Sequence, residues 1–449
     1  MRVVIVGAGE VGRHLARSLQ HEAELILVDS DAVALGAAEE NIDALSLVGD
    51  ATHRSVLARA EVGRADLLVA VTPSDTVNLV CAALARTMGT RQAVARVDDP
   101  DFFATDLGFE RGVLGVDAVL CASRLVSVEL LRMLAGVRAL HVIPAAAGLV
   151  HVATHQLGED SPLLRSRGRS THWPDAIAAV IRGGHLRPVG EVEHAELGDV
   201  VLICGTPMTV LGVLHDLTPA SGSVRTTIVG GGDVGAQLAR LLGPRGLLDR
   251  VIERDRPRCQ ELAEQLDRVQ VLHGDGTNLA FLREEQVGRA DALLAVTGSD
   301  EANLMTSLLA REVGVDHVFA LVHRPGYAGV YSHLGVSGTV SPHETVAQVI
   351  HWLLPRGALV GSTALTELGV EIVELRVANL AERVADLPLP PGSVVLAIAG
   401  EGVRSARARS SLSAGEHAIA VVPAARVAML EKSLARADRK SDRGKGGGA

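Results

Sequence analysis

The chain has 449 residues, 47% of them hydrophobic and only 2% aromatic, and it carries a formal net charge of −10. This length is enough for about three domains of roughly 150 residues each. The negative charge argues against binding to a nucleic-acid backbone, which needs clustered Lys and Arg, and no apolar stretch reaches the roughly 18 residues of a membrane span.

The first part of the chain predicts alternating strands and helices. Strands are expected near 2–6, 24–28, 44–48, 67–71 and 93–97, and helices near 11–20, 31–40, 54–60 and 76–88. The strands are continuous apolar runs such as LLVAV, which is typical of a parallel sheet covered by helices on both faces. A doubly wound α/β fold is therefore predicted. Because MRVVIVGAG runs directly into the first strand, no cleavable leader is expected.

The second half of the chain repeats the first. Residues 274–314 align with residues 49–89 without a gap, so that Asp50, Thr72 and Asn78 match Asp275, Thr297 and Asn303. Self-similarity of this kind indicates two copies of one structural unit. The tail of each copy contains short strands punctuated by Pro, Gly and Asp, which predicts a small α+β domain. The predicted parts are 1–133 and 224–358 as doubly wound domains, 134–218 and 359–437 as small α+β domains, 218–226 as a linker and 438–449 as a disordered tail.

Each copy contains a G-x-G-x-x-G motif between a strand and a helix. The glycines are Gly7, Gly9 and Gly12 in the first copy, and Gly230, Gly232 and Gly235 in the second. The first glycine permits a tight turn, the second lets a pyrophosphate approach the backbone, and the third packs helix against strand. The helix N-terminus then offers free N–H groups to the phosphates.

An acidic residue ends the second strand of each copy. These residues are Asp29, which Ser30 follows, and Glu253, which Arg254 follows. A carboxylate at this place accepts the ribose hydroxyls and repels a 2′-phosphate, which favours NAD over NADP. The alternative, that these acids only cap helices and bind no ligand, stays open. Because Glu10 and Asp233 add negative charge beside the glycines, we expect NAD(H) rather than ATP, and the cation at Arg254 should let the second site tolerate ADP or ATP better than the first.

No residue pattern near the glycine motifs predicts catalysis. His151 and His155 have i, i+4 spacing, but their segment is predicted as a strand, where this spacing suits a shared metal poorly. Ser341 and His343 flank Pro342, which favours a helix N-terminus over a nucleophile and base. We therefore expect no catalytic residue and no metal site. The four cysteines lie far apart and are expected to be buried thiols of a protein in a reducing compartment: Cys81, Cys121, Cys204 and Cys259.

The ordered motifs VGAGEVG, GDAT, AVTPSDTVNL and ARVDDPDF resemble the RCK (KTN) nucleotide-binding domain family, and VGGGDVG, IERD, GDGT, AVTGSDEANL and GTVSPHETVAQVI repeat them. The resemblance implies that Asp50 and Ala51 lie near the adenine, that Thr72 and Pro73 line the rim and that Arg96 faces the nucleotide. In the second copy, either His323 or Arg324 is expected to correspond to Arg96, and the resemblance does not fix which of the two. The nucleotide-binding residues predicted from motifs and resemblance together are Gly7, Ala8, Gly9, Glu10, Val11, Gly12, Asp29, Asp50, Ala51, Thr72, Pro73, Arg96, Gly230, Gly232, Asp233, Val234, Gly235, Glu253, Asp275 and Thr297.

The same resemblance implies a function without catalysis. Two RCK domains, each followed by a small C-terminal domain, are the organisation of the cytosolic regulatory subunits of Trk potassium uptake systems. The expected protein binds NAD(H), with ATP or ADP as alternative ligands. It assembles into a homo-oligomeric ring of four chains, and it reaches the inner face of the cell membrane through a potassium-transporting partner of the Trk type. Two alternatives stay open: regulation of a channel or exchanger for another ion, and an NAD-dependent oxidoreductase.

Overall fold

The computed structural model divides the chain into two compact units. One unit comprises residues 1–129, 226–244 and 248–355, and the other comprises 130–225, 245–247 and 356–449. The described residues are 1–99, 102–103, 108–166, 171–218, 225–324, 326–354, 358–377, 383–400, 402–406, 410–413 and 415–434. The predicted tail 438–449 and most of the predicted linker 218–226 lie outside these ranges.

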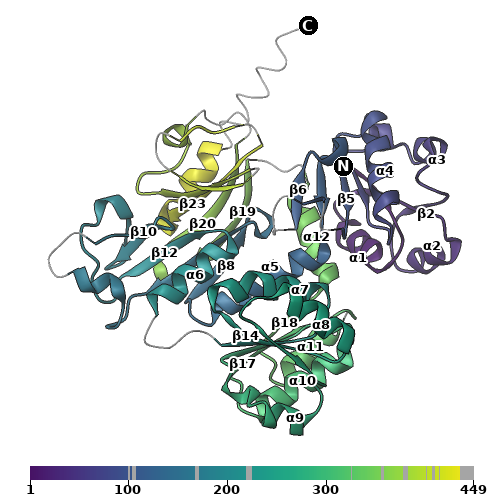
Figure 1. The fold of residues 1–449 in the computed structure, drawn as a ribbon. Coiled ribbons are helices and arrows are strands. Elements are labelled where there is room, and N and C mark those ends of the chain that lie inside the picture. The colour runs from purple at the N-terminus through teal and green to yellow at the C-terminus, as the bar shows by residue number, and fades with distance from the viewer. Residues whose placement is uncertain are drawn as a thin grey trace. The chain divides into compact units, whose positions relative to one another are not determined.

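The first copy of the repeat begins with a predominantly parallel sheet in the order β3-β2-β1-β4-β5-β7-β6 (Figure 1). Its strands are β1 (Arg2–Val6), β2 (Glu24–Asp29), β3 (Leu45–Val48), β4 (Leu67–Ala70), β5 (Ala93–Arg96), β6 (Phe109–Arg111) and β7 (Ala118–Leu120). Its helices are α1 (Glu10–Leu19), α2 (Ala32–Glu39), α3 (Arg54–Arg59), α4 (Asp75–Thr87) and α5 (Ala122–Gly136). The elements predicted up to residue 97 are confirmed to within one residue at each end.

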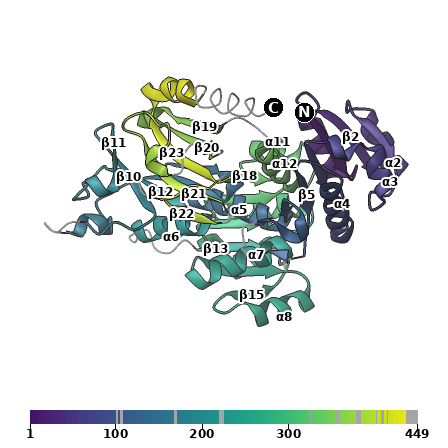
Figure 2. The ribbon, with the colours of Figure 1, turned by 90° about the horizontal axis from the view of Figure 1, so that it is seen from above.

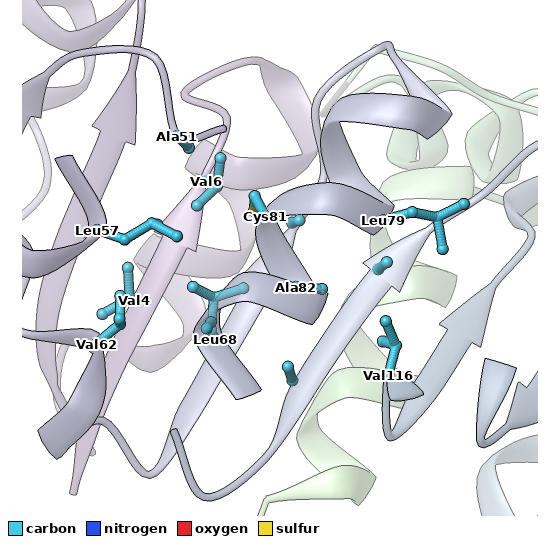
Figure 3. Close-up of a cluster of buried hydrophobic side chains, with 14 of the residues drawn as sticks. Val4, Val6, Ala51, Leu57, Val62, Leu68, Leu79, Cys81, Ala82 and Val116 are labelled. Carbon is cyan, nitrogen blue, oxygen red and sulfur yellow. The ribbon is translucent and has the colours of Figure 1, made fainter. Parts of the chain in front are cut away.

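Strand order decides which helices cover which face of this sheet. Right-handed crossovers place α1 and α2 on one face, because β1, β2 and β3 run outward in one direction. They place α3 and α4 on the other, where the chain returns to β4 and β5. Figure 3 shows that second face, on which Val4, Val6 and Leu68 pack against Leu57 and Ala82. Burying apolar side chains on both faces explains the continuous apolar strands.

The second copy of the repeat has the same architecture. Its sheet has the order β15-β14-β13-β16-β17-β18, and its paired strands are parallel. Its strands are β13 (Thr226–Val229), β14 (Leu248–Glu253), β15 (Gln270–His273), β16 (Ala292–Ala295), β17 (His317–Leu321) and β18 (Gly338–Val340). Its helices are α7 (Asp233–Leu242), α8 (Arg256–Gln265), α9 (Leu279–Glu284), α10 (Asp300–Glu312), α11 (Tyr327–His333) and α12 (Pro342–Leu353).

Helix α12 belongs to the second copy by sequence but packs on the first. It lies against α1, and its His351 Nε2 is 3.1 Å from the Ser18 hydroxyl. Trp352 packs edge-on against Phe109 of β6, with 5.9 Å between the ring centroids. The guanidinium carbon of Arg111 lies 5.8 Å from the Trp352 ring. Helix α12 therefore joins the second copy to α1 and β6 of the first copy.

The other unit holds two mainly antiparallel sheets, in the orders β11-β10-β12-β9-β8 and β19-β20-β23-β21-β22 (Figure 2). The strands of the first are β8 (His141–Ala145), β9 (Val150–Gln156), β10 (Ile177–Arg182), β11 (His185–Pro188) and β12 (Val200–Gly205), and α6 (Pro207–Leu217) follows them. The strands of the second are β19 (Leu359–Leu365), β20 (Val370–Arg376), β21 (Val394–Ala399), β22 (Val403–Ser405) and β23 (His417–Pro423).

A buried carboxylate links these two sheets. Glu374 on β20 accepts a hydrogen bond from the Ala146 N–H with Oε2 at 2.9 Å, and its Oε1 lies 2.6 Å from His417 Nδ1. Both side chains are almost fully buried. The antiparallel sheets, together with the two doubly wound domains, confirm the predicted fold class.

The predicted cysteines are buried and free, and burial raises the pKa of Cys81 and Cys204 to about 12. Cys81 and Cys204 are therefore protonated thiols at neutral pH. Among the described residues, none of the helices is both long enough and apolar enough to span a bilayer.

Candidate functional site

The turn between β1 and α1 can be built only with glycine at its first and third motif positions. Gly7 has φ +104°, and a Cβ added there would lie 3.0 Å from the Thr72 nitrogen. A Cβ added at Gly12 would lie 1.8 Å from the Gly7 carbonyl oxygen. Gly230 and Gly235 repeat this geometry, with φ +110° and a 1.9 Å approach. The glycines therefore hold the helix against the strand end, as the motif predicts.

The second glycine of each motif faces open space. A Cβ added at Gly9 or Gly232 would meet no atom within 4 Å. Both residues are helix N-caps, and because glycine has no side chain, no capping side chain accepts a hydrogen bond from the first N–H groups of either helix. Space beside the backbone and uncapped N–H groups are what a dinucleotide pyrophosphate requires. The geometry at both turns therefore fits this group, and each turn is called a cradle below.

The acids that end the second strands are held by the cradle backbone. Asp29 accepts hydrogen bonds from the N–H groups of Ala8 at 2.6 Å and Asp31 at 2.9 Å. Glu253 accepts the equivalent bonds from Gly231 at 2.5 Å and Asp255 at 2.7 Å. A carboxylate has about four acceptor positions, so each acid keeps capacity for ribose hydroxyls. The structure thus gives these acids a second task, fixing the turn, which the sequence did not indicate.

Asp50 and Asp275 form matching turns at the ends of β3 and β15. Each accepts hydrogen bonds at 2.9 Å and 2.7 Å from the N–H and hydroxyl of the threonine two positions later, Thr52 or Thr277. These bonds, the hydroxyl first, lower the pKa of both carboxyl groups. Both acids are therefore charged at neutral pH.

Buried asparagines, to which the sequence analysis assigned no role, fix the rim of each cradle. Asn78 accepts the N–H and hydroxyl of Thr72 at 2.9 Å and 2.7 Å, and donates to the Thr72 and Arg96 carbonyls at 2.8 Å and 2.9 Å. Asn303 makes the same four bonds with Thr297 and Leu321. The available signal was the identical T-x-S-D-x-x-N spacing of the two copies.

The same bonds settle which residue corresponds to Arg96. Asn78 bonds the Arg96 carbonyl and Asn303 bonds the Leu321 carbonyl, so neither His323 nor Arg324 corresponds to Arg96. Instead, the N–H groups of His323 and Arg324 donate to Asp300 at 2.8 Å and 2.9 Å. The expectation that one of the two matches Arg96 was wrong, because the strands end in register and the histidine lies two residues beyond.

In the second copy, five of the eight predicted residues line one cavity. Its volume is about 500 Å³, within the range of known cofactor sites. The predicted residues that line it are Gly230, Gly232, Glu253, Asp275 and Thr297. Arg254 lines it too, as the sequence contrast with Ser30 suggests.

A further cavity of about 390 Å³ is lined by both copies. Val11 and Arg96 of the first copy lie there with Asp233, Val234 and His343 of the second. Arg96 is paired in it with Asp98, with 2.6 Å between Nη2 and Oδ2. Pro73, which lies just beyond the C-terminal end of β4, is exposed.

In each cradle, an arginine side chain donates a hydrogen bond to the carbonyl of the residue between the first two glycines, called the middle carbonyl below. Arg13 of α1 donates to the Ala8 carbonyl at 3.2 Å, whereas Arg258 of α8 donates through Nε to the Gly231 carbonyl at 2.7 Å. The sequence analysis assigned no role to either residue. The two contacts come from different helices, so no motif position could reveal them.

The residues considered for catalysis or metal binding lie in other kinds of environment. His151 on β9 is fully buried without a hydrogen-bond partner, and burial lowers its pKa to about 3. His155 Nδ1 lies 3.0 Å from the Arg138 carbonyl. Ser341 is the N-cap of α12. Within the described ranges, no cluster of three or more His, Cys, Asp or Glu has a metal-binding arrangement.

Sequence comparison identifies both doubly wound domains. The family model of the TrkA-N domain matches residues 3–121 and 226–342. A protein from Archaeoglobus fulgidus named Trk system potassium uptake protein TrkA homolog is 31% identical, with 89% of this chain and 91% of that protein covered. The Trk system potassium uptake protein TrkA of Vibrio alginolyticus is 29% identical, with 93% and 95% covered.

Solved structures share the fold over most of the chain. The crystal structure of the GsuK RCK domain has a TM-score of 0.55 at 20% identity and covers 97% of this chain and 95% of its own. The GsuK channel bound to NAD has a TM-score of 0.54 at 20% identity and covers 97% and 79%. At this identity the two matches establish the architecture, two doubly wound domains with their small C-terminal domains.

Proposed function

This chain belongs to the family of the Trk system potassium uptake proteins TrkA, and we propose on that premise that it is the NAD(H)-sensing regulatory subunit of a potassium uptake system. The observation that carries the proposal is that each cradle has both features of a dinucleotide site. Each combines a glycine open to a ligand with a carboxylate at the end of the neighbouring strand.

The contact between the copies supplies a physical route for regulation. A ligand changes a distant gate only by favouring one of two arrangements of the protein. Helix α1 begins in the first cradle, and α12 of the second copy packs along it. Nucleotide binding at the first cradle therefore acts on an interface that both copies share.

The proposal extends to ligand, partner and assembly. The first cradle prefers NAD(H), and the second, with Arg254 in its cavity, also accepts ADP or ATP. The protein is cytosolic, it is held at the membrane by a potassium-transporting subunit of the Trk type, and it assembles as a tetramer that presents eight doubly wound domains. It performs no hydride transfer. Support comes from the names of the relatives.

Binding and turnover distinguish this function from an enzyme. In a calorimetric titration of the purified chain with NADH, we expect saturable binding that weakens in the Asp29→Ala variant, and a constant absorbance of NADH at 340 nm over hours. Steady oxidation of NADH that Asp29→Ala abolishes would overturn the proposal. Restored rubidium uptake in cells that lack their own regulatory subunit, with co-purification of the membrane protein, tests the partner.

A further inference from the structure

A histidine of the second copy reaches the phosphate end of the first cradle. His343 is the second residue of α12, and its Nε2 lies 3.0 Å from Glu10 Oε2. Glu10 directly follows Gly9 and is the first residue of α1. The His343 side chain is 14% exposed and that of Glu10 is 62% exposed. The pair thus joins a largely buried imidazole to a carboxylate that faces the open side of the cradle.

The matching place at the second cradle has no histidine. Helix α5 begins after β7 as α12 begins after β18, which makes Ser123 the counterpart of His343 and Asp233 the counterpart of Glu10. Ser123 and Asp233 line the same cavity as His343. A serine hydroxyl carries no charge at any accessible pH, so at this position the two cradles differ in a group that can bind a proton. His323, which lines the same cavity beside Gly232 and Thr297, is held by Asp300.

We propose that His343 is a specificity-determining residue of the first cradle, which takes up a proton when an anionic nucleotide binds there and thereby makes this cradle, and not the second, bind more tightly as the pH falls. The inference rests on the proposed function, because it deepens the regulation of the same nucleotide site.

The free protein keeps this histidine neutral. Burial lowers the pKa of His343, and the Glu10 carboxylate opposes that effect. The position at the N-terminus of α12 acts in the same direction as burial, because helix N-termini carry partial positive charge. His14 of α1 and His323 after β17 also lie near enough to affect the ring.

Arg96, Asp98 and His323, which also line the cavity, are already paired. Arg96 is bonded to Asp98, and His323 Nδ1 lies 3.0 Å from Asp300 Oδ1. Asp233 of α7 also lines the cavity. Glu10 is therefore the charge that His343 contacts directly, and the neutral ring leaves it uncompensated.

A nucleotide phosphate changes this balance. Helix N-termini bind phosphates, and a phosphate at the start of α1 adds negative charge beside Glu10 and His343. Negative charge nearby favours the protonated imidazole, so the pKa of His343 rises on binding. The gain in affinity is then complete below the pKa of the free protein and is lost as the pH rises through the pKa of the complex. Protonation also offsets the repulsion between Glu10 and the phosphates.

Calorimetry in buffers of different ionisation enthalpy measures this proton directly. NADH is titrated into the full-length chain at pH 6.0 and 8.0, with Glu253→Ala weakening the second cradle so that binding at the first dominates, and with Asp29→Ala doing the reverse. We expect a fraction of one proton to be taken up at the first cradle, and its affinity to rise roughly 3- to 10-fold from pH 8.0 to 6.0, since a full proton changes Kd about tenfold per pH unit. The second cradle shows neither effect.

Three substitutions separate charge from packing. His343→Ser, which installs the residue found at the other cradle, and His343→Gln, which keeps a hydrogen-bonding side chain, both abolish proton uptake and flatten the pH dependence. Ser123→His gives the second cradle a pH dependence of its own. Unchanged proton uptake in both His343 variants would overturn the inference while leaving the proposed function intact. Failure of the wild-type chain to bind NADH at either pH would overturn both.

Discussion

Compared residue by residue, the first and second cradles keep the same backbone contacts and differ in the side chains around them. The carboxylate at the strand end, the turn at Asp50 or Asp275 and the buried asparagine are the same in both. The arginine on the middle carbonyl, the residue after the strand-end acid and the histidine across the cavity are not. The backbone geometry is thus common to both cradles, whereas the charged side chains around it differ.

The largest expected effect tests whether the two cradles are structurally equivalent. Gly12→Ala and Gly235→Ala each place a Cβ within 2 Å of a carbonyl oxygen, and overpacking of this kind lowers stability by about 1–3 kcal/mol. We expect each variant to lose one of two NADH sites in a calorimetric titration. As matched controls, Gly9→Ala and Gly232→Ala should leave the stability of the free protein unchanged but weaken NADH binding. An undiminished NADH stoichiometry in Gly12→Ala would show that the first turn does not hold the ligand.

A second comparison concerns the small domains. His151 is the second residue of β9 and is fully buried, whereas Glu371, the second residue of β20, is only half-buried. Burial lowers the pKa of folded His151 to about 3, below its ordinary 6.5. The unfolded chain therefore binds this proton first, and stability is lost as the pH falls below about 6.5, by roughly 1.4 kcal/mol per pH unit. Between pH 6.5 and 4.5, we expect the free energy of unfolding to fall by about 2–3 kcal/mol less in the His151→Leu variant than in the wild type.

Urea denaturation can report this effect from one domain. Trp173 donates to the Val192 carbonyl inside the small domain of the first copy, and a Trp352→Phe background leaves it as the sole tryptophan. Glu371→Leu serves as the matched control and should keep the acid sensitivity of the wild type. An identical pH profile for His151→Leu and wild type would contradict the buried, neutral state of this histidine.

The strand-end acids test ligand identity. Asp29→Ala removes two backbone hydrogen bonds and the acceptor for ribose, and should weaken NADH binding by about 1–3 kcal/mol, the scale of losing bonds to a charged group. Glu253→Ala should weaken NADH binding similarly but ATP binding less, because Arg254 remains in that cavity. Titration of both variants with NADH and ATP measures the difference, and Asp29→Asn separates loss of charge from loss of the turn. Equal losses of both ligands in both alanine variants would mean that the cradles do not differ in preference.

The smallest expected effect comes from the arginines. Arg258 donates at 2.7 Å and Arg13 at 3.2 Å, so Arg258→Ala should weaken NADH binding at the second cradle by about 0.5–1.5 kcal/mol, and Arg13→Ala should weaken the first cradle less. Arg240→Ala, which removes an exposed contact with Gln265, is the control and should change neither site. A larger loss of NADH affinity in Arg13→Ala than in Arg258→Ala would contradict this prediction.

The sequence by itself determined the repeat, the doubly wound sheets and the glycine turns. These features depend on local physics, since a Cβ at Gly12 or Gly235 is excluded by its own turn and buried parallel strands require continuous apolar runs. The strand-end acids Asp29 and Glu253 could also be predicted from the sequence, because each is the last residue of a strand.

Only the tertiary structure decided the rest. The support of each turn by Arg13 or Arg258 and the pairing of His343 with Glu10 depend on which elements pack together. His343 and Glu10 are 333 residues apart in the chain, and they meet because α12 leaves its own sheet and packs on α1. Sequence periodicity specifies which face of a helix is apolar, but not which partner buries it, and that choice of partner places the titratable residue beside the first cradle.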